Sequence, residues 1–362
     1  MEFAAKGRLA VRITAADVGK RVSVRRLVGS PDSGATFTDA VGVLTSWDDG
    51  VLIITRRFGD RVRIEESSLV AGKVVPAAPA RRRGPAASYE ELARITARAW
   101  QPVERERLGD WELRAAVRTV PGDGAGAQVR RVAFTRRANS VLPLGDPGLP
   151  LDTALSRVRA WYTQRGLPPY VQVSTGAEGT QELLGARLEA AGWVREVSSE
   201  LRIAPLAPLA DAGEGGDADA REATVRRVRL AREIDAGWLR QYNRTGDAAA
   251  EPDPVVRAVL TAGPSVWFAS VPETDGTDAG VPAAIGRCVV DGRWAGFMAV
   301  EVAPHARRRG LATAVMTALA RQALAEGASA AWLQVESDNT VATTMYGGMG
   351  FDVHHLYHHY RG

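Results

Sequence analysis

The sequence predicts a mixed α/β (α+β) protein of three successive modules, of which the first is all-β and the other two contain both helices and strands. Two segments rich in proline, alanine, glycine and charge, 76–87 and 205–220, have the composition of linkers. Before the first of them only short strand-like runs occur, whereas strands alternate with apolar residues at helical spacing after it. A chain of 362 residues is also longer than one hydrophobic core usually supports.

The composition predicts a soluble globular protein. Hydrophobic residues make up 45% of the chain and charged residues 24%, and no apolar run approaches the roughly 20 residues that cross a bilayer. Charged residues interrupt the N-terminal segment where a signal peptide requires an apolar stretch. Cys288 is the single cysteine, which excludes an internal disulfide, and we expect it to be a buried core residue. We therefore expect a cytoplasmic protein.

Residues 1–75 are expected to form a small SH3-like barrel. The strands are predicted at 21–28, 38–47, 51–57, 61–65 and 73–75, with one helical turn at 66–70. Tight turns are predicted at 48–50 and 58–60, each of which contains glycine and aspartate. Residues 1–84 hold 15 Lys/Arg against 9 Asp/Glu, so the basic excess of the chain is N-terminal.

Residues 88–204 are expected to form an α/β module. Its first helix begins after Ser88, which can cap it, and Glu91 has the spacing that closes a capping box. The remaining helices are predicted at 152–165 and 180–191, and the strands at 111–120, 129–138, 170–174 and 193–203.

Residues 221–362 form the third module. Its helices are predicted at 231–242, 255–261, 311–326 and 340–347, and its strands at 265–271, 283–290, 293–302, 330–336 and from Phe351 onward. The segment YGGMGFDV in this module is similar to LEAAGWVR in the second, which indicates that the two modules are diverged copies of one unit.

The junction between the predicted strand 293–302 and the helix that follows has the composition of a diphosphate site. The first N–H groups of a helix have no intrahelical acceptor and carry partial positive charge, so they suit phosphate oxygens. Gly310 and Ala312 allow a ligand to approach the backbone closely, and three arginines add positive charge. Because an arginine-rich helix start also arises by chance in such a composition, this motif needs a second one to support it.

The second motif follows the next predicted strand, at residues 339–351. Together the two resemble the GNAT superfamily of N-acetyltransferases, with Arg307-x-x-Gly310-x-Ala312 followed by Asn339-x-x-Ala342-x-x-x-Tyr346-x-x-x-Gly350-Phe351. The resemblance implies a GNAT fold with a central mixed sheet whose middle strands splay apart, and acetyl-CoA as co-substrate. The cofactor-binding residues that it implies are Val300, Val302, Ala303, Arg307, Arg308, Arg309, Gly310, Leu311, Ala312, Thr313, Asn339, Ala342 and Tyr346. Among them, the backbone near Val300 would pair with pantetheine, and the amides of 308–313 would meet the pyrophosphate.

The resemblance also implies the catalytic roles. Tyr346 would face the thioester sulfur as the general acid, and a backbone N–H at the end of the strand 293–302 would stabilise the oxyanion. A tyrosine pKa near 10 and a thiol pKa near 8.5 make full proton transfer uphill by roughly 2 kcal/mol, so we expect partial or water-assisted transfer. Glu301 is the candidate general base, with Glu336, Asp338 or a relay of ordered water as alternatives.

The whole chain resembles an actinobacterial GNAT group with an SH3-like N-terminal domain and tandem GNAT-like modules. This wider resemblance rests on the order of the modules and on the segments RRANSVLPLG, AWYTQRGLPPY and HHLYHHYR. In the middle module the stretch LGDPGLPLDTALSRV places Asp152 and two prolines where phosphate-facing amides are needed. We therefore expect a degenerate middle module that does not bind CoA.

Two functions of different class follow from these patterns. The first is direct transfer of an acetyl group from acetyl-CoA to a primary amine in a ternary complex, with no metal; the acceptor and the oligomeric state cannot be read from the sequence. The second is a regulatory protein that binds nucleic acid or a protein through its basic barrel, with the GNAT fold as CoA sensor or scaffold. Asp247, Glu251 and Asp253 are expected to form an acidic loop that attracts a cationic amine or is merely solvated.

Overall fold

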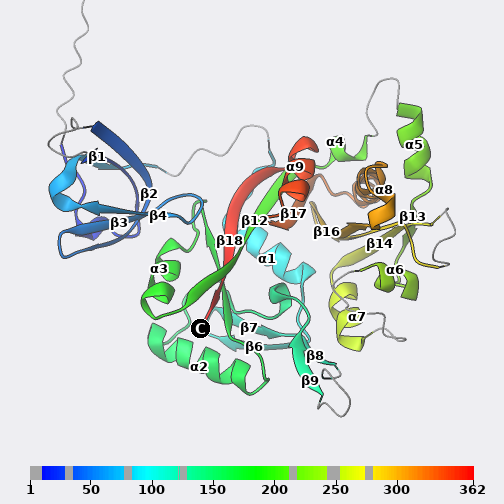
Figure 1. The fold of residues 1–362 in the computed structure, drawn as a ribbon, viewed down its shortest axis with the longest axis horizontal. Helices are drawn as coiled ribbons and strands as arrows, with labels where there is room; N and C mark the ends of the chain where they lie inside the picture. The colour runs from blue at the N-terminus through cyan, green and yellow to red at the C-terminus, as the bar shows by residue number, and fades with distance from the viewer. Residues whose placement is uncertain are drawn as a thin grey trace, which may run out of the picture.

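The structure is a computed structural model that describes residues 10–28, 36–76, 84–120, 122, 129–211, 218–242, 253–273 and 280–362. It has the predicted mixed α/β architecture: a small N-terminal sheet lies beside a large central sheet that carries helices (Figure 1). None of the described helices is both long enough and apolar enough to cross a bilayer.

The N-terminal module is an antiparallel five-stranded sheet of order β4-β3-β2-β1-β5. Its elements are η1 (Ala15–Asp17), β1 (Arg21–Val28), β2 (Thr36–Asp48), β3 (Val51–Thr55), β4 (Arg61–Glu65), η2 (Glu66–Ser68) and β5 (Leu69–Val74). Asp49 and Gly50 have φ angles of 50° and 73°, as a two-residue hairpin turn requires. The sheet has its own hydrophobic core and fits the small barrel expected from the sequence.

A single eight-stranded sheet runs through both α/β modules, in the order β11-β18-β12-β17-β16-β15-β14-β13. Its strands are β11 (Tyr170–Thr175), β12 (Val194–Pro205), β13 (Arg229–Ala231), β14 (Ser265–Val271), β15 (Ala284–Asp291), β16 (Trp294–Val302), β17 (Ala330–Glu336) and β18 (Asp352–Arg361). Only β16 and β17 are parallel neighbours, and α8 (Leu311–Ala325) is the helical crossover that such a pair needs.

The last strand of the chain lies inside the middle module. β18 pairs with β11 on one edge and with β12 on the other, and β12 in turn pairs with β17. Figure 1 shows β18 between these segments of much earlier sequence. The sequence placed this strand in the third module without indicating its neighbours, and both of the strands that pair with it belong to the middle module. Residues 355–360 are all buried, which a strand achieves when it is covered on both faces and paired on both edges.

In its described residues, the rest of the middle module consists of three helices and short strands. They are α1 (Tyr89–Ala99), β6 (Glu104–Leu108), β7 (Trp111–Ala115), β8 (Val117–Val120), β9 (Arg130–Ala133), η3 (Arg136–Ala138), β10 (Leu142–Pro143), α2 (Leu151–Thr163) and α3 (Glu182–Ala190). The predicted strand 111–120 is broken at Ala116, whose N–H donates to the side chain of Asn139 at 2.8 Å. β6 was not predicted, because its Glu-Arg-Glu-Arg pattern contains no apolar face.

The second predicted linker is partly folded, contrary to expectation. Leu206 and Leu209 are buried, and the short helix α4 (Ala207–Ala210) lies against α8. A further helix, α5 (Ala218–Arg226), also packs on α8. The proline and alanine content suggested a linker, but leucines three residues apart reach the same core. Residues 77–83 and 212–217 of the two linkers lie outside the described residues.

The two faces of the central sheet have separate cores. α1, α6 (Ala236–Gln241) and α7 (Pro254–Thr261) pack on the face that we name the α1 face. α4, α8 and α9 (Thr340–Gly348) pack on the opposite face, the α8 face. Cys288 belongs to the core of the α8 face, as expected from the sequence, and burial raises the pKa of its thiol to about 12.

The N-terminal module is held to the middle module through the hairpin between β3 and β4. A terminal nitrogen of Arg57 donates to the carbonyl of Val353 at 2.9 Å, and Arg195 donates to the carbonyl of Gly59 at 3.1 Å. Arg61 forms an ion pair with Glu189 at 2.7 Å. These contacts engage Arg57 and Arg61, two of the arginines that contribute to the basic excess of the N-terminal module.

Candidate active site

The pairing between β16 and β17 ends halfway along both strands. It runs from Trp294↔Ala330 to Phe297↔Leu333 and stops there. Beyond that point Ala299 has a φ of 51°, and the register between β15 and β16 shifts between Ile285 and Arg287. A positive φ at a residue with a Cβ is a local strain that redirects the strand. The carboxyl ends of the two parallel strands therefore separate.

The carboxyl end of β16 is paired on one side only among the described residues. Val302 is paired with Ala284 of β15, and the N–H of Ala303 donates to the carbonyl of Ala283 at 2.9 Å. The side that faces β17 has no ladder here. Val300, Val302 and Ala303, which the sequence associated with pantetheine, thus present an edge to which an extended ligand can add hydrogen bonds.

The predicted phosphate loop is an exposed turn that starts α8. After the short helix η5 (Pro304–Ala306), Arg308 and Gly310 take φ angles of 63° and 75°, and Gly310 is the N-cap residue. No side chain caps this helix start, and a Cβ added at Gly310 would meet nothing within 4 Å. Exposed N–H groups in such a left-handed turn form a concave anion-binding surface.

The other residues of this loop that were predicted to bind the cofactor differ in their solvent exposure. Arg307, Arg309 and Thr313 are exposed, Ala312 is half-buried, and the side chain of Leu311 is buried in the core of the α8 face. Arg307 also donates to the carbonyl of Val302 at 3.4 Å. The loop thus combines exposed backbone with cationic side chains.

α9 carries the second motif beside the separated strands. Asn339 is the N-cap residue, and its Oδ1 accepts from the N–H of Ala342 at 3.1 Å. The side-chain oxygen of Asn339 therefore has a structural role in addition to the ligand contact expected from the resemblance. Tyr346 is half-buried, and its ring meets Phe351 edge-on with centroids 6.0 Å apart. Burial raises the pKa of the Tyr346 hydroxyl to about 12.

The two carboxylates nearest to the strand ends lie on the α1 face. Glu301 is paired with Ile285, and Ile285 belongs to the core of that face. Glu336 follows Trp332 and Gln334 at alternate positions of β17, and Trp332 belongs to the same core. Asp338, by contrast, is exposed in the turn before α9. The structure therefore groups Glu301 and Glu336 on one face, with Tyr346 on the other side of the sheet.

The expected acidic loop is described only at its end. Asp253 caps α7 by accepting from the N–H of Val255 at 2.9 Å, and it forms an ion pair with Arg118 at 2.8 Å. Its carboxylate is thus engaged within the chain, whereas Asp247 and Glu251 lie outside the described residues.

Sequence reasoning did not identify a polar cluster on the α1 face of the middle module. There Arg137 donates to the hydroxyl of Tyr357 at 2.8 Å, close to the buried side chains of Arg114 and His359. Two features of the sequence could have indicated this cluster. They are the pair of arginines before Ala138 and the aromatic residues at alternate positions of the last strand. These residues come together only because β18 lies between β11 and β12.

Known proteins are similar to this chain over most of its length. The model of the family described as "Probable histone acetyltransferase Rv0428c C-terminal" matches residues 87–360. The probable histone acetyltransferase Rv0428c of Mycobacterium tuberculosis is 29% identical over 344 residues, which cover 93% of each chain.

Three of the solved structures to which this chain is similar are acetyltransferase-related chains. A GCN5-related N-acetyltransferase from Kribbella flavida has a TM-score of 0.44 and 18% identity, over 74% of this chain and 94% of that one. A tandem GNAT protein from the clavulanic acid biosynthesis pathway has a TM-score of 0.46 and 15% identity, over 78% and 90%. A GCN5-related N-acetyltransferase from Sphaerobacter thermophilus has a TM-score of 0.43 and 14% identity, over 77% and 94%.

Proposed function

The chain belongs to the family described as the probable histone acetyltransferase Rv0428c C-terminal family, and from that premise we propose that it transfers the acetyl group of acetyl-CoA to a primary amine. The acetyltransferase class agrees with the GNAT resemblance of the sequence. The observation that carries the proposal is the combination of separated strands with an uncapped, exposed helix start immediately after one of them. That combination provides one surface for an extended pantetheine and another for a diphosphate.

The residues that would hold acetyl-CoA follow from this arrangement. The backbone of Val300–Ala303 would pair with the amide groups of pantetheine, and the first amides of α8 would bind the pyrophosphate. Arg307, Arg308 and Arg309 would add charge beside these amides. Gly310 suits the closest approach, because its left-handed φ disfavours residues with a side chain and the space around it is open to a ligand.

Tyr346 is proposed as the donor of a hydrogen bond to the departing sulfur. Its pKa of about 12 keeps the hydroxyl protonated at neutral pH. Full transfer of that proton to a thiolate with a pKa near 8.5 would be uphill by roughly 5 kcal/mol. The tyrosine therefore stabilises developing charge on sulfur through a hydrogen bond, and water supplies the proton that the free thiol finally carries.

Glu301 is proposed to receive the proton of the attacking amine. It lies on the unpaired end of β16 and faces the α1 side, from which the amine would approach. Glu336 is the alternative on the neighbouring strand. An ordered water between either carboxylate and the amine would serve the same purpose.

We propose a single active centre for the chain. In the middle module α2 starts after Pro150, which has no side-chain cap, and Asp152 lies in its first turn. A carboxylate at that position repels phosphate. It also lies at the positive N-terminal end of the helix dipole, which would otherwise attract an anionic ligand. The middle module would then shape the acceptor side of the third module.

The direct test is titration of the full chain with acetyl-CoA in a calorimeter. We expect one equivalent to bind the natural protein, and none to bind the Gly310→Asp variant, because a side chain and a negative charge would enter the phosphate site. Gly292→Asp is the matched control, since Gly292 is also in a left-handed turn with open space around it. A folded natural protein that binds no acetyl-CoA contradicts the proposed function, and two equivalents contradict the single centre.

A further inference from the structure

The α1 face of the middle module carries buried donors that acetyl transfer does not use. We name the group of Arg114, Arg137, Tyr357 and His359 the basic cluster. Arg114, Tyr357 and His359 are 2%, 1% and 3% exposed, so the cluster lies within the protein. Within the cluster, Arg137 alone is half-buried and thus lies at its solvent-facing edge, which we call the rim.

Arg114 is a buried charge with neutral partners. Its guanidinium donates to the carbonyl and hydroxyl of Ser140, both at 2.9 Å, and to the side-chain oxygen of Gln172 at 3.2 Å. Within the described part of the chain no carboxylate lies at ion-pair distance from it. Removing a cation from water costs several kcal/mol unless an anion compensates. Ser140 and Gln172 supply hydrogen bonds but no countercharge.

His359 adds an unpartnered polar group to the same place. Both of its ring nitrogens are buried and have no hydrogen-bond partner among the described residues. Its ring lies edge-on to Tyr357 and to Tyr170, with centroids 5.7 Å and 6.3 Å away. Burial, followed by the charges of Arg137, Arg114 and Arg136, lowers the pKa of this imidazole. A neutral imidazole retains one N–H, and a donor buried without an acceptor costs about 1–3 kcal/mol.

Arg137 completes the cluster at its rim. One nitrogen donates to the hydroxyl of Tyr357 at 2.8 Å, and the guanidinium lies 5.8 Å and 5.9 Å from the ring centres of Trp100 and Tyr357. A guanidinium held between aromatic rings is oriented before any ligand arrives. Close by, the carboxylate of Glu196 is already bound by the hydroxyl of Tyr170 at 2.6 Å and by Arg361 at 3.2 Å.

The basic cluster borders the separated ends of β16 and β17. Tyr357 is paired with Ser199, and Ser199 is paired with Glu336. Two steps across a sheet place Tyr357 and Glu336 about 10 Å apart. Trp100, under Arg137, donates to the side chain of Gln334 at 3.1 Å. The cluster and the proposed base thus share one face of one sheet.

From this we infer that the basic cluster is an anion subsite for the acceptor, which binds a carboxylate or phosphate group while the amine reaches toward the ends of β16 and β17. The inference rests on the proposed acetyl transfer for the direction of the amine, but the anion site stands on the cluster alone. Arg114 and Arg137 supply the charge, and the N–H of His359 finds its acceptor. The acceptor class is then an amine joined to an acidic group through a chain of several atoms, such as the side-chain amine of free lysine.

The first experiment observes the anion site without turnover. Full-length protein with ¹⁵N-labelled histidine is titrated with sodium acetate and with sodium phosphate at constant ionic strength. The ring nitrogens of His359 are assigned by their loss in His359→Phe. We expect saturable shifts of these signals with one of the two salts, which also identifies the kind of anion. Arg137→Gln should abolish the shifts, whereas Arg107→Gln, an exposed arginine of β6, should leave them unchanged.

Signals of His359 that respond to neither salt, in protein that still binds acetyl-CoA, would overturn the subsite and leave the proposed function intact. Saturable shifts in protein that binds no acetyl-CoA would support the subsite and sink the proposed function. The two ideas therefore fail separately.

The second experiment compares two acceptors that differ by one carboxylate. Acetyl transfer to lysine and to 1,5-diaminopentane is followed by release of free CoA thiol. We expect kcat/KM to favour lysine by about tenfold, the effect of one charge-assisted contact. Arg137→Gln should bring the ratio close to one, and Arg107→Gln should preserve it. Natural protein that prefers the diamine would contradict the assignment of the acceptor class.

Discussion

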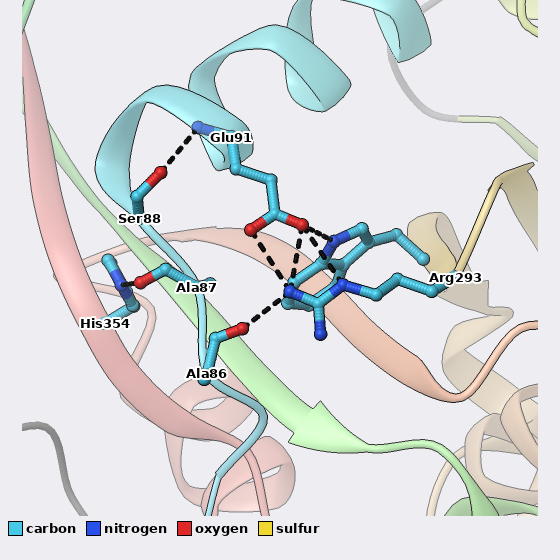
Figure 2. Close-up of polar contacts among 7 residues, drawn as sticks. Ala86, Ala87, Ser88, Glu91, Arg293 and His354 are labelled. Atoms are coloured by element: carbon cyan, nitrogen blue, oxygen red, sulfur yellow. Dashed lines mark hydrogen bonds and ion pairs between the residues drawn. The ribbon is translucent and has the colours of Figure 1, made fainter.

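Glu91, in the first turn of α1, accepts from the guanidinium of Arg293 with both carboxylate oxygens, at 2.9 Å and 3.1 Å (Figure 2). The same carboxylate accepts from the indole N–H of Trp294 at 2.7 Å, and Arg293 also donates to the carbonyl of Ala86 at 2.6 Å. Trp294 begins β16, the strand whose far end separates from β17. Glu91 therefore fixes the first helix of the middle module to the strand that carries the proposed active centre.

Replacement of Glu91 by alanine should lower the free energy of unfolding by about 1–3 kcal/mol, because the buried indole N–H of Trp294 loses its acceptor. Urea denaturation followed by tryptophan fluorescence measures this. Glu90→Ala is the matched control, since Glu90 is exposed and, among the described residues, forms an ion pair with Arg94 at 3.5 Å. Equal effects of the two substitutions would show that the Glu91 contacts contribute nothing beyond helix propensity.

Arg287 should be among the least replaceable residues of the chain. It is fully buried, and its guanidinium donates to the carbonyls of Leu260 at 2.6 Å, Ala99 at 3.1 Å and Ala262 at 2.7 Å. These carbonyls lie at the carboxyl ends of α1 and α7, where a positive charge is favourable. Burial lowers the pKa of Arg287 to about 10, so it stays protonated at neutral pH.

We expect Arg287→Met to cost about 3–5 kcal/mol, because several buried carbonyls lose their donor at once. Chemical denaturation of the variant and of Arg232→Met provides the comparison. The side chain of Arg232 is 51% exposed and pairs with Glu326, so its loss should matter little. A midpoint for Arg287→Met close to that of the natural protein would contradict this role.

The sequence predicted the local elements of the third module well, because each depends on a short pattern. β14 and β17 have the predicted bounds, and a turn at Asp291 and Gly292, between two of the predicted strands, joins β15 to β16. The positions of Gly310 and Tyr346 on a helix start and a short helix also followed from motif spacing.

What the sequence did not reveal is which strands pair across the two modules. The run of His, Leu and Tyr residues in β18 suits any inner position of a sheet, so nothing local distinguishes its own module from the preceding one. Local spacing also could not show the tertiary partner of Glu91. Its distance from Ser88 in the sequence predicted that its side chain would close a capping box. Ser88 does cap α1 by accepting from the N–H of Glu91 at 3.1 Å, but the carboxylate of Glu91 turns instead to Arg293, whose proximity only the tertiary fold creates.

Acid should destabilise the fold through the histidines of β18. Burial, with smaller effects of neighbouring charges, lowers the pKa of His355 to about 3 and that of His358 to about 4. Burial also lowers the pKa of His359. An unfolded histidine has a pKa near 6.5, so the unfolded chain binds more protons below that value. Stability is therefore complete above about pH 6.5 and falls as the pH drops toward 4 and then 3.

Two histidine substitutions distinguish the effect of histidine protonation on stability from the effect of the carboxylates, which also titrate in acid. The imidazole of His358 is hydrogen-bonded to Thr175 at 2.9 Å and Ser198 at 2.8 Å, so His358→Gln is expected to retain hydrogen bonds while removing one titrating group. Its free energy of unfolding should fall less between pH 6.5 and pH 4 than that of the natural protein. His305→Gln, at a half-exposed position, is the comparison variant that makes the same chemical change outside β18. Parallel pH profiles for His358→Gln and the natural protein would refute the assignment.

Tyr346→Phe should reduce kcat about 10- to 100-fold while the dissociation constant of acetyl-CoA stays close to that of the natural protein. The ring remains to pack against Phe351, and only the hydroxyl that would bond the departing sulfur is lost. Because the pKa of this hydroxyl is about 12, the kcat of the natural protein should show no loss from tyrosine ionisation below about pH 10. Tyr360→Phe makes the same chemical change at a hydroxyl bound to Glu189 and should leave kcat unaltered. If Tyr346→Phe retains full kcat, the departing thiolate is stabilised by water alone and Tyr346 serves only to pack α9 onto the α8 face.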